Sequence, residues 1–456
     1  MMRRAFHWVG AAVCATTLAC GLNGCVSTVR SDNFAPSATA VAPQASVAVS
    51  DKEITDSWFY LLGRLAVLRQ QRLDFEDDGF HWNELVHRKP GGVQWANPNL
   101  DVVFSEAWVA IDEDSCVLLD IPRIEGRYYT WHMLNGWGET VLNINERTFP
   151  KQPYGRYALC LKGSHVRIPA GALRIDLPVR TLRVAARVEM GDSAETAIRL
   201  QHEFKLTPLG EPKPEPVINV PRFTNAKLPR ADAFDFADAI LAGSPDINPG
   251  MDEVRSEVRA VTALVQSGPE GRKRVDAIIG QVALPMLAQR IRALGPVANG
   301  RMRPAVVGTY DSDYVGRSVA DLVGIWANKP SEVAYFGMPH VDGSATYVQT
   351  FPKDALPGSR VRYFWSVVAV DSTQYRVIPN PLNRYILNRQ SRLQPNPDGS
   401  LTLAFGPRKP DGVPESNWLP TPAGERYNLT YRLYGMLPSG ADASYVPPPL
   451  INIPNQ

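Results

Sequence analysis

The sequence predicts a mainly β protein with helices, arranged as a β domain, a helical spacer and a second β domain. Short runs rich in β-branched and aromatic residues occur within residues 91–210 and again within residues 346–434, which is the pattern of β-strands. Residues 232–296 instead carry apolar residues at three- and four-residue steps, as helices do. The 39 prolines and 34 glycines suit β domains with many turns.

The individual elements can be placed along the chain. A first helix is expected over residues 51–72, where Ile54, Trp58, Leu61, Leu65 and Leu68 form one apolar face that packs on the body. Strands are expected at residues 102–104, 107–111, 116–119, 128–134, 346–351, 363–370, 401–405 and 427–434. Further helices are expected at residues 234–241, 254–264, 275–294 (interrupted by Pro285) and 311–326.

These patterns divide the chain into parts with different roles. We expect a signal peptide at residues 1–25, a flexible tether at 26–50, an N-terminal helix with the first β domain at 51–215, a linker with the helical module at 216–300, and the second β domain at 301–445. The tether is rich in Ala, Ser, Val and Pro and has few charges, which is typical of a linker.

The N-terminus resembles a bacterial lipoprotein signal peptide. A positively charged start precedes an apolar run at residues 8–18, and the segment ends in Leu-Asn-Gly-Cys at residues 22–25. The apolar run is too short to span a bilayer of about 30 Å as a mature helix. We therefore expect acyl chains such as palmitate on Cys25, which would make the membrane a partner through a lipid anchor.

Other fates of the N-terminus stay open. Residues 17–20 form a competing, weaker box that ends in Cys20, and plain secretion or an uncleaved anchor are the remaining alternatives. Val26 follows Cys25 where an aspartate often retains lipoproteins at the inner membrane. We therefore expect the bacterial cell envelope as the location, with the anchor in the outer membrane and the protein facing the periplasm.

Composition excludes some partner classes. The net charge of +2 gives no electrostatic footprint for nucleic acid. After the signal peptide, no segment has 18 uninterrupted apolar residues, so no membrane-spanning helix is expected in the mature chain. Cys116 and Cys160 remain after cleavage, each in a short β-like run. An oxidising envelope permits a disulfide between them if their strands are neighbours, and two unpaired buried cysteines are the alternative.

Two series of motifs follow one another along the chain. The first half carries Pro98-Asn99-Leu100-Asp101, Ser105, Gly126-Arg127-Tyr128-Tyr129, Asn135-Gly136-Trp137 and Leu206-Thr207-Pro208-Leu209. The second half carries Phe364-Trp365-Ser366, Asp371, Asn380-Pro381-Leu382-Asn383-Arg384-Tyr385, Asp398-Gly399-Ser400-Leu401, Asn417-Trp418-Leu419-Pro420 and Arg432-Leu433-Tyr434. The first series resembles the bacterial domain of unknown function 1254, and the second resembles its usual companion, 1214.

This resemblance covers about residues 55–438, in the order that the family has. It implies two β-sandwich or jelly-roll domains joined by a small helical module, and it implies no established reaction. Val102, Phe104 and Asn135 depart from the family pattern, which has Thr, Tyr and Asp there. These departures remove hydroxyls and a carboxylate from any site that would use them.

Common catalytic and metal-binding motifs are absent from the sequence. It contains no Gly-x-Ser-x-Gly elbow, no His-Glu-x-x-His, no Cys-x-x-Cys and no phosphate loop. His81, Glu84 and His87 could suggest metal ligands, but on a helix the two histidines would lie about 240° apart, and zinc needs three or four converging ligands. We therefore expect no metal site and no cofactor.

Polar and aromatic residues of the two motif series are the candidate ligand contacts. They are Asn99, Asp101, Arg127, Tyr129, Trp137, Trp365, Asp371, Asn383, Arg384, Tyr385, Asn417 and Trp418. Directional hydrogen-bonding groups beside flat apolar rings bind carbohydrates or small polar molecules. The same residue types also stabilise loops, through side-chain hydrogen bonds to the backbone and pairing of arginine with carboxylates, and aromatic residues often pack in the core. A purely structural role therefore stays open.

Three functions are compatible with these features. The first is a cell-envelope lipoprotein that binds a small polar or carbohydrate-like ligand. The second is an envelope enzyme in which Asp101 or Asp371 is the acid or base and Arg127 or Arg384 holds an anionic group. The third is a structural envelope protein that engages another component. Because no nucleophile–base pair is visible, binding is the leading hypothesis, and the oligomeric state stays open.

Overall fold

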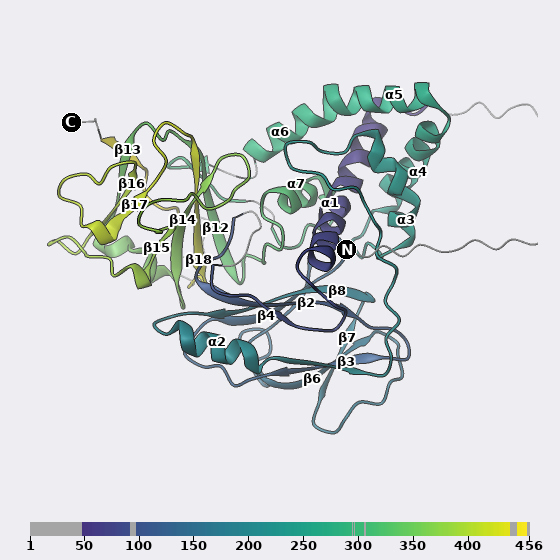
Figure 1. Ribbon diagram of the computed structural model, residues 1–456, viewed down its shortest axis with the longest axis horizontal. Helices are drawn as coiled ribbons and strands as arrows, with labels where there is room; N and C mark the ends of the chain where they lie inside the picture. The colour runs from purple at the N-terminus through teal and green to yellow at the C-terminus, as the bar shows by residue number, and fades with distance from the viewer. Residues whose placement is uncertain are drawn as a thin grey trace, which may run out of the picture. The chain divides into compact units, whose positions relative to one another are not determined.

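The computed structural model describes residues 48–91, 97–293, 295, 297–304, 307–437 and 445–453. These residues form four sheets and a group of helices (Figure 1), which confirms the predicted combination of β-sheet with helix. The expected signal peptide with Cys25, and most of the expected tether, lie outside the described residues.

The first β region contains two sheets. Five strands pair in the order β1-β2-β8-β4-β5 and four in the order β7-β6-β3-β9. The elements are β1 (Val86–His87), β2 (Val102–Ala110), β3 (Cys116–Ile121), β4 (Tyr129–Leu134), β5 (Thr140–Ile144), β6 (Gly155–Leu161), β7 (Leu173–Leu177), β8 (Thr181–Glu189), α2 (Ala194–Glu203) and β9 (Lys205–Leu209). Val109, Leu119, Trp131 and Leu159 belong to one buried cluster to which both sheets contribute.

The helical module surrounds α1. Its helices are α1 (Asp51–Glu76), α3 (Ala237–Ala242), α4 (Asp252–Gln266), α5 (Pro269–Ile278), α6 (Leu284–Arg292) and α7 (Tyr314–Val323), with a 3-10 turn at Ala231–Phe236. Ser50 caps α1 with a capping box that it shares with Glu53. None of the helices in the described part of the chain is long and apolar enough to cross a membrane.

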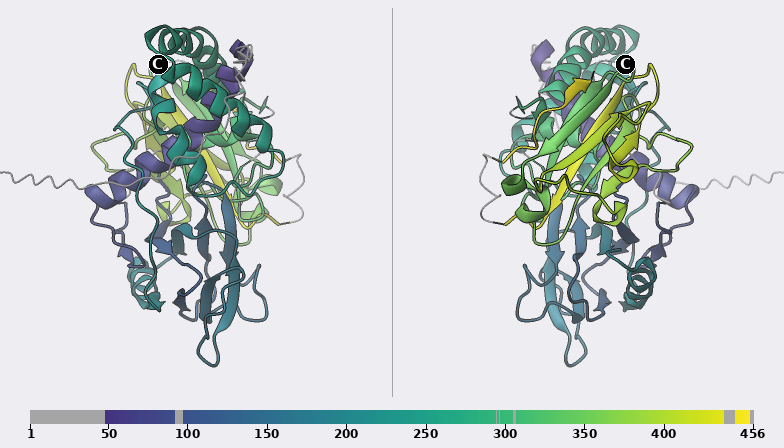
Figure 2. Two further views of the ribbon diagram at one scale, coloured as in Figure 1. Left: turned by 90° about the vertical axis from the view of Figure 1, so that its right-hand side faces the viewer. Right: turned by 90° about the vertical axis from the view of Figure 1, so that its left-hand side faces the viewer.

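The second β region also contains two sheets, ordered β10-β11-β12-β18-β14-β15 and β17-β16-β13-β19. The strands are β10 (Val297–Ala298), β11 (Arg301–Met302), β12 (Val333–Val341), β13 (Thr346–Phe351), β14 (Trp365–Asp371), β15 (Ile386–Asn388), β16 (Leu401–Gly406), β17 (Trp418–Pro420), β18 (Tyr427–Tyr434) and β19 (Ile451–Ile453). Phe336, Val367, Leu403 and Tyr431 share one buried cluster. In the right-hand panel of Figure 2 these strands face the viewer, below the helices.

The two β regions meet through buried aromatic and charged groups. Tyr128 of the first region packs edge-on against Tyr434, with ring centroids 4.7 Å apart. The Tyr128 hydroxyl donates to Glu332 Oε2 at 3.0 Å, and the same oxygen pairs with Arg147 Nη2 at 2.5 Å. Val49–Gln456 accordingly form one compact unit.

The surroundings of α1 differ from the prediction. Instead of one apolar face, the helix is buried on all sides from Trp58 to Leu68. One side packs in the helical module, and Val67 packs beside Trp108 of the five-stranded sheet. A helix that lies between two layers needs no polar face. The apolar residues at three- and four-residue steps therefore indicate only one of the two surfaces through which α1 makes contacts.

Two further elements refine the predicted order. Residues 194–203 were expected within a β-rich stretch, but they form α2, which the Ser193 side chain caps by accepting from the Thr196 amide. The expected helix at 275–294 is divided by a π-helical turn, Ile279–Ala283. Pro285 lies in the first turn of α6, where a missing N–H is tolerated.

Candidate functional site

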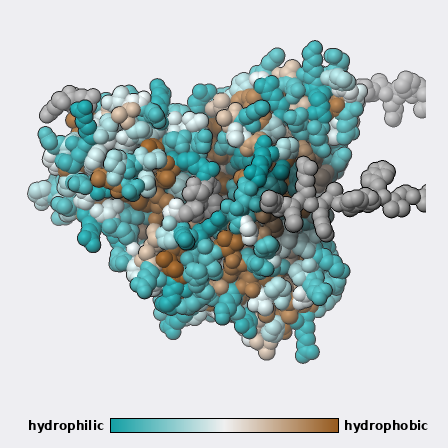
Figure 3. Space-filling model, viewed as in Figure 1, coloured by the Kyte–Doolittle hydropathy of each residue, from teal (hydrophilic) through white to brown (hydrophobic). Residues whose placement is uncertain are grey.

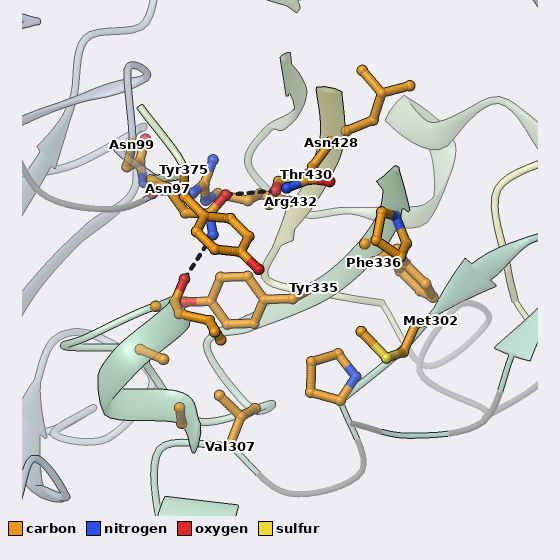
Figure 4. A pocket seen from close by; sticks show the side chains of 18 of the residues that line it. Asn97, Asn99, Met302, Val307, Tyr335, Phe336, Tyr375, Asn428, Thr430 and Arg432 are labelled. Atoms are coloured by element: carbon orange, nitrogen blue, oxygen red, sulfur yellow. Dashed lines mark hydrogen bonds between the residues drawn. The ribbon is translucent and has the colours of Figure 1, made fainter. Parts of the chain in front are cut away.

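A cavity of about 190 Å³ lies where the two β regions meet the end of α7 (Figure 4). The first β region contributes Asn97, Asn99 and Arg187 to its wall, and β12 and β18 contribute Tyr335, Thr430 and Arg432. The segment after α7, the loop at Tyr375, the end of α6 and residues between 302 and 307 also contribute to the wall. The cavity therefore depends on the junction between the two halves of the chain.

Strand β18 directs alternate side chains into the cavity. Thr430, Arg432 and Tyr434 line it, whereas Tyr431 and Leu433 belong to the core of the second β region. Successive side chains of a strand point to opposite faces. The strand thus joins the hydrophobic core to the wall of the cavity.

Asn97 connects four segments of the cavity wall. Its backbone N–H donates to the Tyr375 carbonyl oxygen at 2.9 Å. Its side-chain Nδ2 donates to the Val323 carbonyl oxygen, and its Oδ1 accepts from the Thr430 hydroxyl, both at 2.8 Å (Figure 4). Its carbonyl oxygen accepts from Arg432 Nη2. One asparagine thus fixes the position of the Tyr375 loop, the α7 end and β18.

The backbone around the cavity adopts unusual conformations. Asn97, Trp326, His340 and Tyr375 line it and have φ values of 50°, 64°, 57° and 60°. Such left-handed conformations are uncommon outside glycine and rare for bulky residues. They cluster at ligand sites, where the surrounding structure holds them. A cavity wall that is held in this way is already formed before a ligand arrives.

Arg432 is the cationic group of the cavity wall with unused hydrogen-bonding capacity. Its side chain is buried, with 4% of the residue exposed, and its Nη1 has no hydrogen-bond partner among the described residues. The nearby Asp101 carboxyl is also buried and accepts from Asn388 Nδ2 at 2.6 Å. Burial raises the pKa of Asp101 to about 6, against the lowering effects of Ser366, Asn388 and Arg432.

Arg187 is a second buried guanidinium in the wall. It donates to His132 Nδ1 at 2.9 Å and to the carbonyl oxygens of Ala185 and Trp326, both at 3.0 Å. Burial, and then the charge of Arg187, lower the pKa of His132 well below its usual value. His132 is therefore neutral and accepts from Arg187, and its Nε2 lies 2.8 Å from the Thr140 hydroxyl.

The described lining lacks several residue types that are common in catalytic sites. None of the described lining residues is an aspartate, glutamate, serine or cysteine. The Thr430 hydroxyl already donates to Asn97, and His340 has no carboxylate beside it in the lining. A nucleophile with an adjacent oriented base is the usual sign of covalent catalysis, and the lining does not contain that pair.

Two protein-family models match the chain in sequence order. The model of DUF1254, described as a protein of unknown function, matches residues 81–208. The model of DUF1214, also described as a protein of unknown function, matches residues 338–438. The chain belongs to the family that pairs DUF1254 with DUF1214. This result confirms the resemblance seen in the sequence. The cavity lies between the DUF1254 region (residues 81–208) and the DUF1214 region (residues 338–438).

A solved structure shares this fold. The VPA0106 protein from Vibrio parahaemolyticus superposes with a TM-score of 0.58 at 17% identity, over 88% of this chain and 99% of that one. A putative uncharacterized protein from Burkholderia cenocepacia aligns over 88% of this chain and 93% of that one, with a TM-score of 0.44 and 13% identity. No curated protein matches the chain significantly.

The DUF1254 candidates lie at different depths around the cavity. Asn99 lines it and donates to the Tyr434 hydroxyl at 2.7 Å, while its Oδ1 accepts from the Asp101 amide. Asp101 lies next to the lining and does not belong to it. Arg127 donates to the Glu189 carbonyl oxygen at 2.8 Å, and Tyr129 to that of Pro153 at 2.7 Å.

Trp137, the second aromatic candidate of the first half, contacts the helical module. Trp137 is fully buried and donates through Nε1 to the Ser244 carbonyl oxygen at 3.0 Å. The Arg317 guanidinium lies 4.6 Å from its ring centroid. Arg317 pairs in turn with Asp246 at 2.9 Å. Trp137 thus lies in a buried network away from the cavity lining.

One DUF1214 candidate supports the cavity indirectly. Asp371 accepts hydrogen bonds from the amides of Thr373, Gln374 and Arg376 at 2.6–2.9 Å. These bonds shape the loop that carries Tyr375 into the cavity wall. Trp365, by contrast, is buried in the core of the second β region.

The remaining DUF1214 candidates form a separate loop cluster. Arg384 donates to the carbonyl oxygens of Glu415 and Trp418 at 2.5 and 3.0 Å. Asn417 is fully buried and bonds to backbone atoms of Gln394 and Thr402. The Tyr385 hydroxyl donates to Asn383 Oδ1 at 3.1 Å, and Trp418 Nε1 donates to the Gly406 carbonyl oxygen. These five residues thus form hydrogen bonds that stabilise the loops of the DUF1214 region.

The histidine motif adopts no helix. His87 lies in β1, its Nδ1 is 2.9 Å from the Ser105 hydroxyl, and its ring centroid is 4.3 Å from that of His202. Burial, and then His202, lower its pKa to about 4. Within the residues that the structure describes, no three His, Cys, Asp or Glu side chains gather as metal ligands.

The sequence left the state of the cysteines open. Cys116 and Cys160 lie directly opposite each other in β3 and β6. They form a disulfide, with Cα atoms 4.5 Å apart. It ties together two strands of the four-stranded sheet in the DUF1254 region.

Several residues of the site were not among the candidates. Arg187, Tyr335, Tyr375 and Thr430 lie outside the motifs that carry the resemblance, and Arg432 lies within one of them. The alternation of polar and apolar residues in β18 was the usable signal, because it puts Thr430 and Arg432 on the face opposite the core.

Proposed function

We propose that this protein is a lipid-anchored cell-envelope protein that binds a small molecule in the cavity between its DUF1254 and DUF1214 regions. The observation that carries the proposal is the wall itself. Four non-glycine residues in left-handed conformations and the hydrogen bonds of Asn97 hold the cavity open. Pre-formed concave sites with a few convergent polar groups are the usual ligand sites of proteins.

Binding explains the lining better than the enzymatic alternative does. Asp371 uses both carboxylate oxygens on loop amides, and Asp101 lies behind the lining. Arg127 and Arg384 bond mainly to backbone carbonyl oxygens. These residues have structural partners and do not face one another across a common space.

An envelope location fits two independent features. The Leu-Asn-Gly-Cys motif at residues 22–25 provides a lipidation site, and the Cys116–Cys160 disulfide suits an oxidising compartment. The proposal also includes the arrangement of the sheets. We infer that each pair of sheets forms a sandwich or jelly-roll domain, because the two sheets of each pair contribute to one buried cluster.

The binding proposal is tested by closing the cavity. Gly337 lines it, and a Cβ at this position would meet only the Met302 carbonyl oxygen, at 3.9 Å. Gly337→Phe should therefore fill the cavity without displacing backbone. We expect a metabolite library to yield ligands that raise the Tm of the full-length wild-type protein and not that of Gly337→Phe.

A glycine outside the cavity provides the matched control. Gly358 has its nearest neighbour, Trp365, 3.7 Å from the built Cβ, and does not belong to the lining. Gly358→Ala should keep the ligand response. Equal responses in wild type and Gly337→Phe would refute the cavity as the site. The anchor is tested separately, because Cys25→Ala should release the protein from the membrane fraction.

A further inference from the structure

We propose that the ligand of this cavity is a small amphiphile with a carboxylate group, which docks on Arg432 and extends its apolar body toward Met302, Val307 and Phe336. The inference rests on the proposed function and narrows it to one class of ligand. It follows from the unpaired guanidinium nitrogen, from the charge balance of the lining and from the way polar and apolar groups are divided within it.

The unpaired nitrogen indicates a missing acceptor. Arg432 Nη1 is buried and has no hydrogen-bond partner in the described part of the chain, while Nη2 donates to the Asn97 carbonyl oxygen. Leaving a buried charged donor unpaired is costly. A carboxylate is the natural partner, because charge-assisted bonds from arginine to carboxylates are short and strong.

The charge balance of the lining also favours an anion. Arg187 and Arg432 are buried in it, Arg292 lies exposed at its edge, and none of the described lining residues is acidic. The partners of Arg187 are neutral, namely His132 and two carbonyl oxygens. Asp101 lies behind Arg432; its Oδ1 accepts from Asn388, and its Oδ2 is buried without a hydrogen-bond partner among the described residues. Burial raises the pKa of this carboxyl to about 6, so it offsets the charge of Arg432 only in part. Room for one more negative charge therefore remains.

The cavity is polar at one end and apolar at the other. Figure 4 shows Asn97, Thr430, Arg432 and Asn428 together on one side, and Val307, Met302 and Phe336 away from them. Such a division fits a molecule with one charged end. The volume of about 190 Å³ is below the 300–1,000 Å³ of typical drug-sized sites. A medium-chain fatty acid or a small aromatic acid has the appropriate size.

Three probes of equal length test the charge requirement. We would measure binding of octanoate, 1-octanol and octylamine to the full-length protein in lipid nanodiscs by calorimetry, with empty nanodiscs as the blank. We expect octanoate to bind at least tenfold more tightly than 1-octanol, and octylamine not to bind in the cavity. Octanoate binding should disappear in Gly337→Phe.

The guanidinium is tested by substitution. Arg432→Gln should weaken octanoate at least tenfold and leave 1-octanol unchanged. Arg123→Gln is the matched control, because the Arg123 side chain is 70% exposed and contacts Glu125 and the Tyr154 ring, both outside the cavity lining. It should change neither affinity. If Arg432→Gln does not fold, the ratio of octanoate to octanol affinity in the wild type decides the question.

The outcomes separate this inference from the proposed function. Equal affinities for octanoate and 1-octanol, both abolished by Gly337→Phe, would overturn the carboxylate and support the binding cavity. If a neutral ligand from the library binds and octanoate does not, the carboxylate requirement is likewise overturned and the binding cavity is supported. Octanoate binding that survives Gly337→Phe would overturn the inference, because the carboxylate would then bind elsewhere.

Discussion

The Asn388 side-chain amide donates a 2.6 Å hydrogen bond to Asp101 Oδ1, which joins the DUF1214 region to the DUF1254 region. Both side chains are buried. Asn99, two residues before Asp101, makes a parallel connection to the Tyr434 hydroxyl at 2.7 Å. The motif at residues 98–101 thus links the DUF1254 region to the DUF1214 region and borders the cavity at their junction.

The raised pKa of Asp101 predicts a pH-dependent stability. Burial raises this pKa from 3.8 to about 6. The folded state therefore binds the proton more tightly than the unfolded state, so the free energy of unfolding should increase as the pH falls through 6 toward 4. For this one group the full change is about 3 kcal/mol. Asp101→Asn, which does not titrate, should lack this contribution.

Urea unfolding at about pH 7.5 and pH 4.5 measures the Asp101 effect. Relative to Asp101→Asn, the wild type should be less stable at the higher pH and regain stability at the lower one. Asp411→Asn, at an exposed position, is the control for unrelated acid effects. A stability difference between wild type and Asp101→Asn that is the same at both pH values would contradict the prediction.

The disulfide should stabilise the DUF1254 region. It closes a loop with a sequence separation of 44 residues between Cys116 and Cys160. By the chain-entropy relation, such a loop adds about 4 kcal/mol to the free energy of unfolding. Replacing both cysteines with alanine should lower that free energy by about this amount. A reducing agent should destabilise the wild type and leave the double variant unchanged; equal effects on both would argue against the bond.

Arg384 should contribute moderately to stability. If Arg384 paired with a buried carboxylate, breaking that pair would cost about 3–5 kcal/mol. The structure instead pairs Arg384 with two carbonyl oxygens and with Glu415, whose side chain is 66% exposed. Arg384→Lys should therefore lower the free energy of unfolding by about 1–2 kcal/mol.

The partner of Arg384 is checked with a second variant. Glu415→Gln removes only the exposed carboxylate, so it should leave the Tm nearly unchanged. If Glu415→Gln destabilised the protein as much as Arg384→Lys, the ion pair would dominate over the two backbone hydrogen bonds.

The sequence predicted the combination of β-sheet with helix because local patterns determine it. Runs rich in β-branched and aromatic residues became β2, β14 and β18, and apolar periodicity became α4. It did not predict that α1 is buried on all sides, because that depends on two layers packing against it. It also did not predict α2, whose Ser193 cap was present but lay among β-rich segments.

The site was predicted less completely for a related reason. Of the candidates named from the sequence, Asn99 lines the cavity, and Asp371 supports the lining through Tyr375. Arg187 and Arg432 were not among the candidates: alternation in β18 indicates the face on which Arg432 lies, but a strand pattern does not indicate what packs against that face. The junction that buries both arginines arises from residues more than 200 positions apart, such as Asn97 and Arg432.

The loop at Asp371 should control the cavity without controlling the fold. Asp371 accepts three amide hydrogen bonds that hold Tyr375 at φ 60°, and the Tyr375 carbonyl oxygen accepts from Asn97. Asp371→Ala removes all three bonds. Because the loop is largely exposed, we expect a cost of about 1–2 kcal/mol in global stability. The affinity of any ligand of the cavity should fall severalfold.

Hydrogen exchange and calorimetry distinguish these effects of Asp371→Ala. Amide exchange at residues 372–376 should accelerate, while exchange in β14 and β18 should stay slow. Asp398→Ala is the matched control, because Asp398 likewise accepts from a loop amide, that of Ser400, and lies outside the cavity lining. It should destabilise its own turn and leave ligand affinity intact. If both variants weakened the ligand equally, the Tyr375 loop would have no special part in holding the cavity, and a general loss of stability would explain the result.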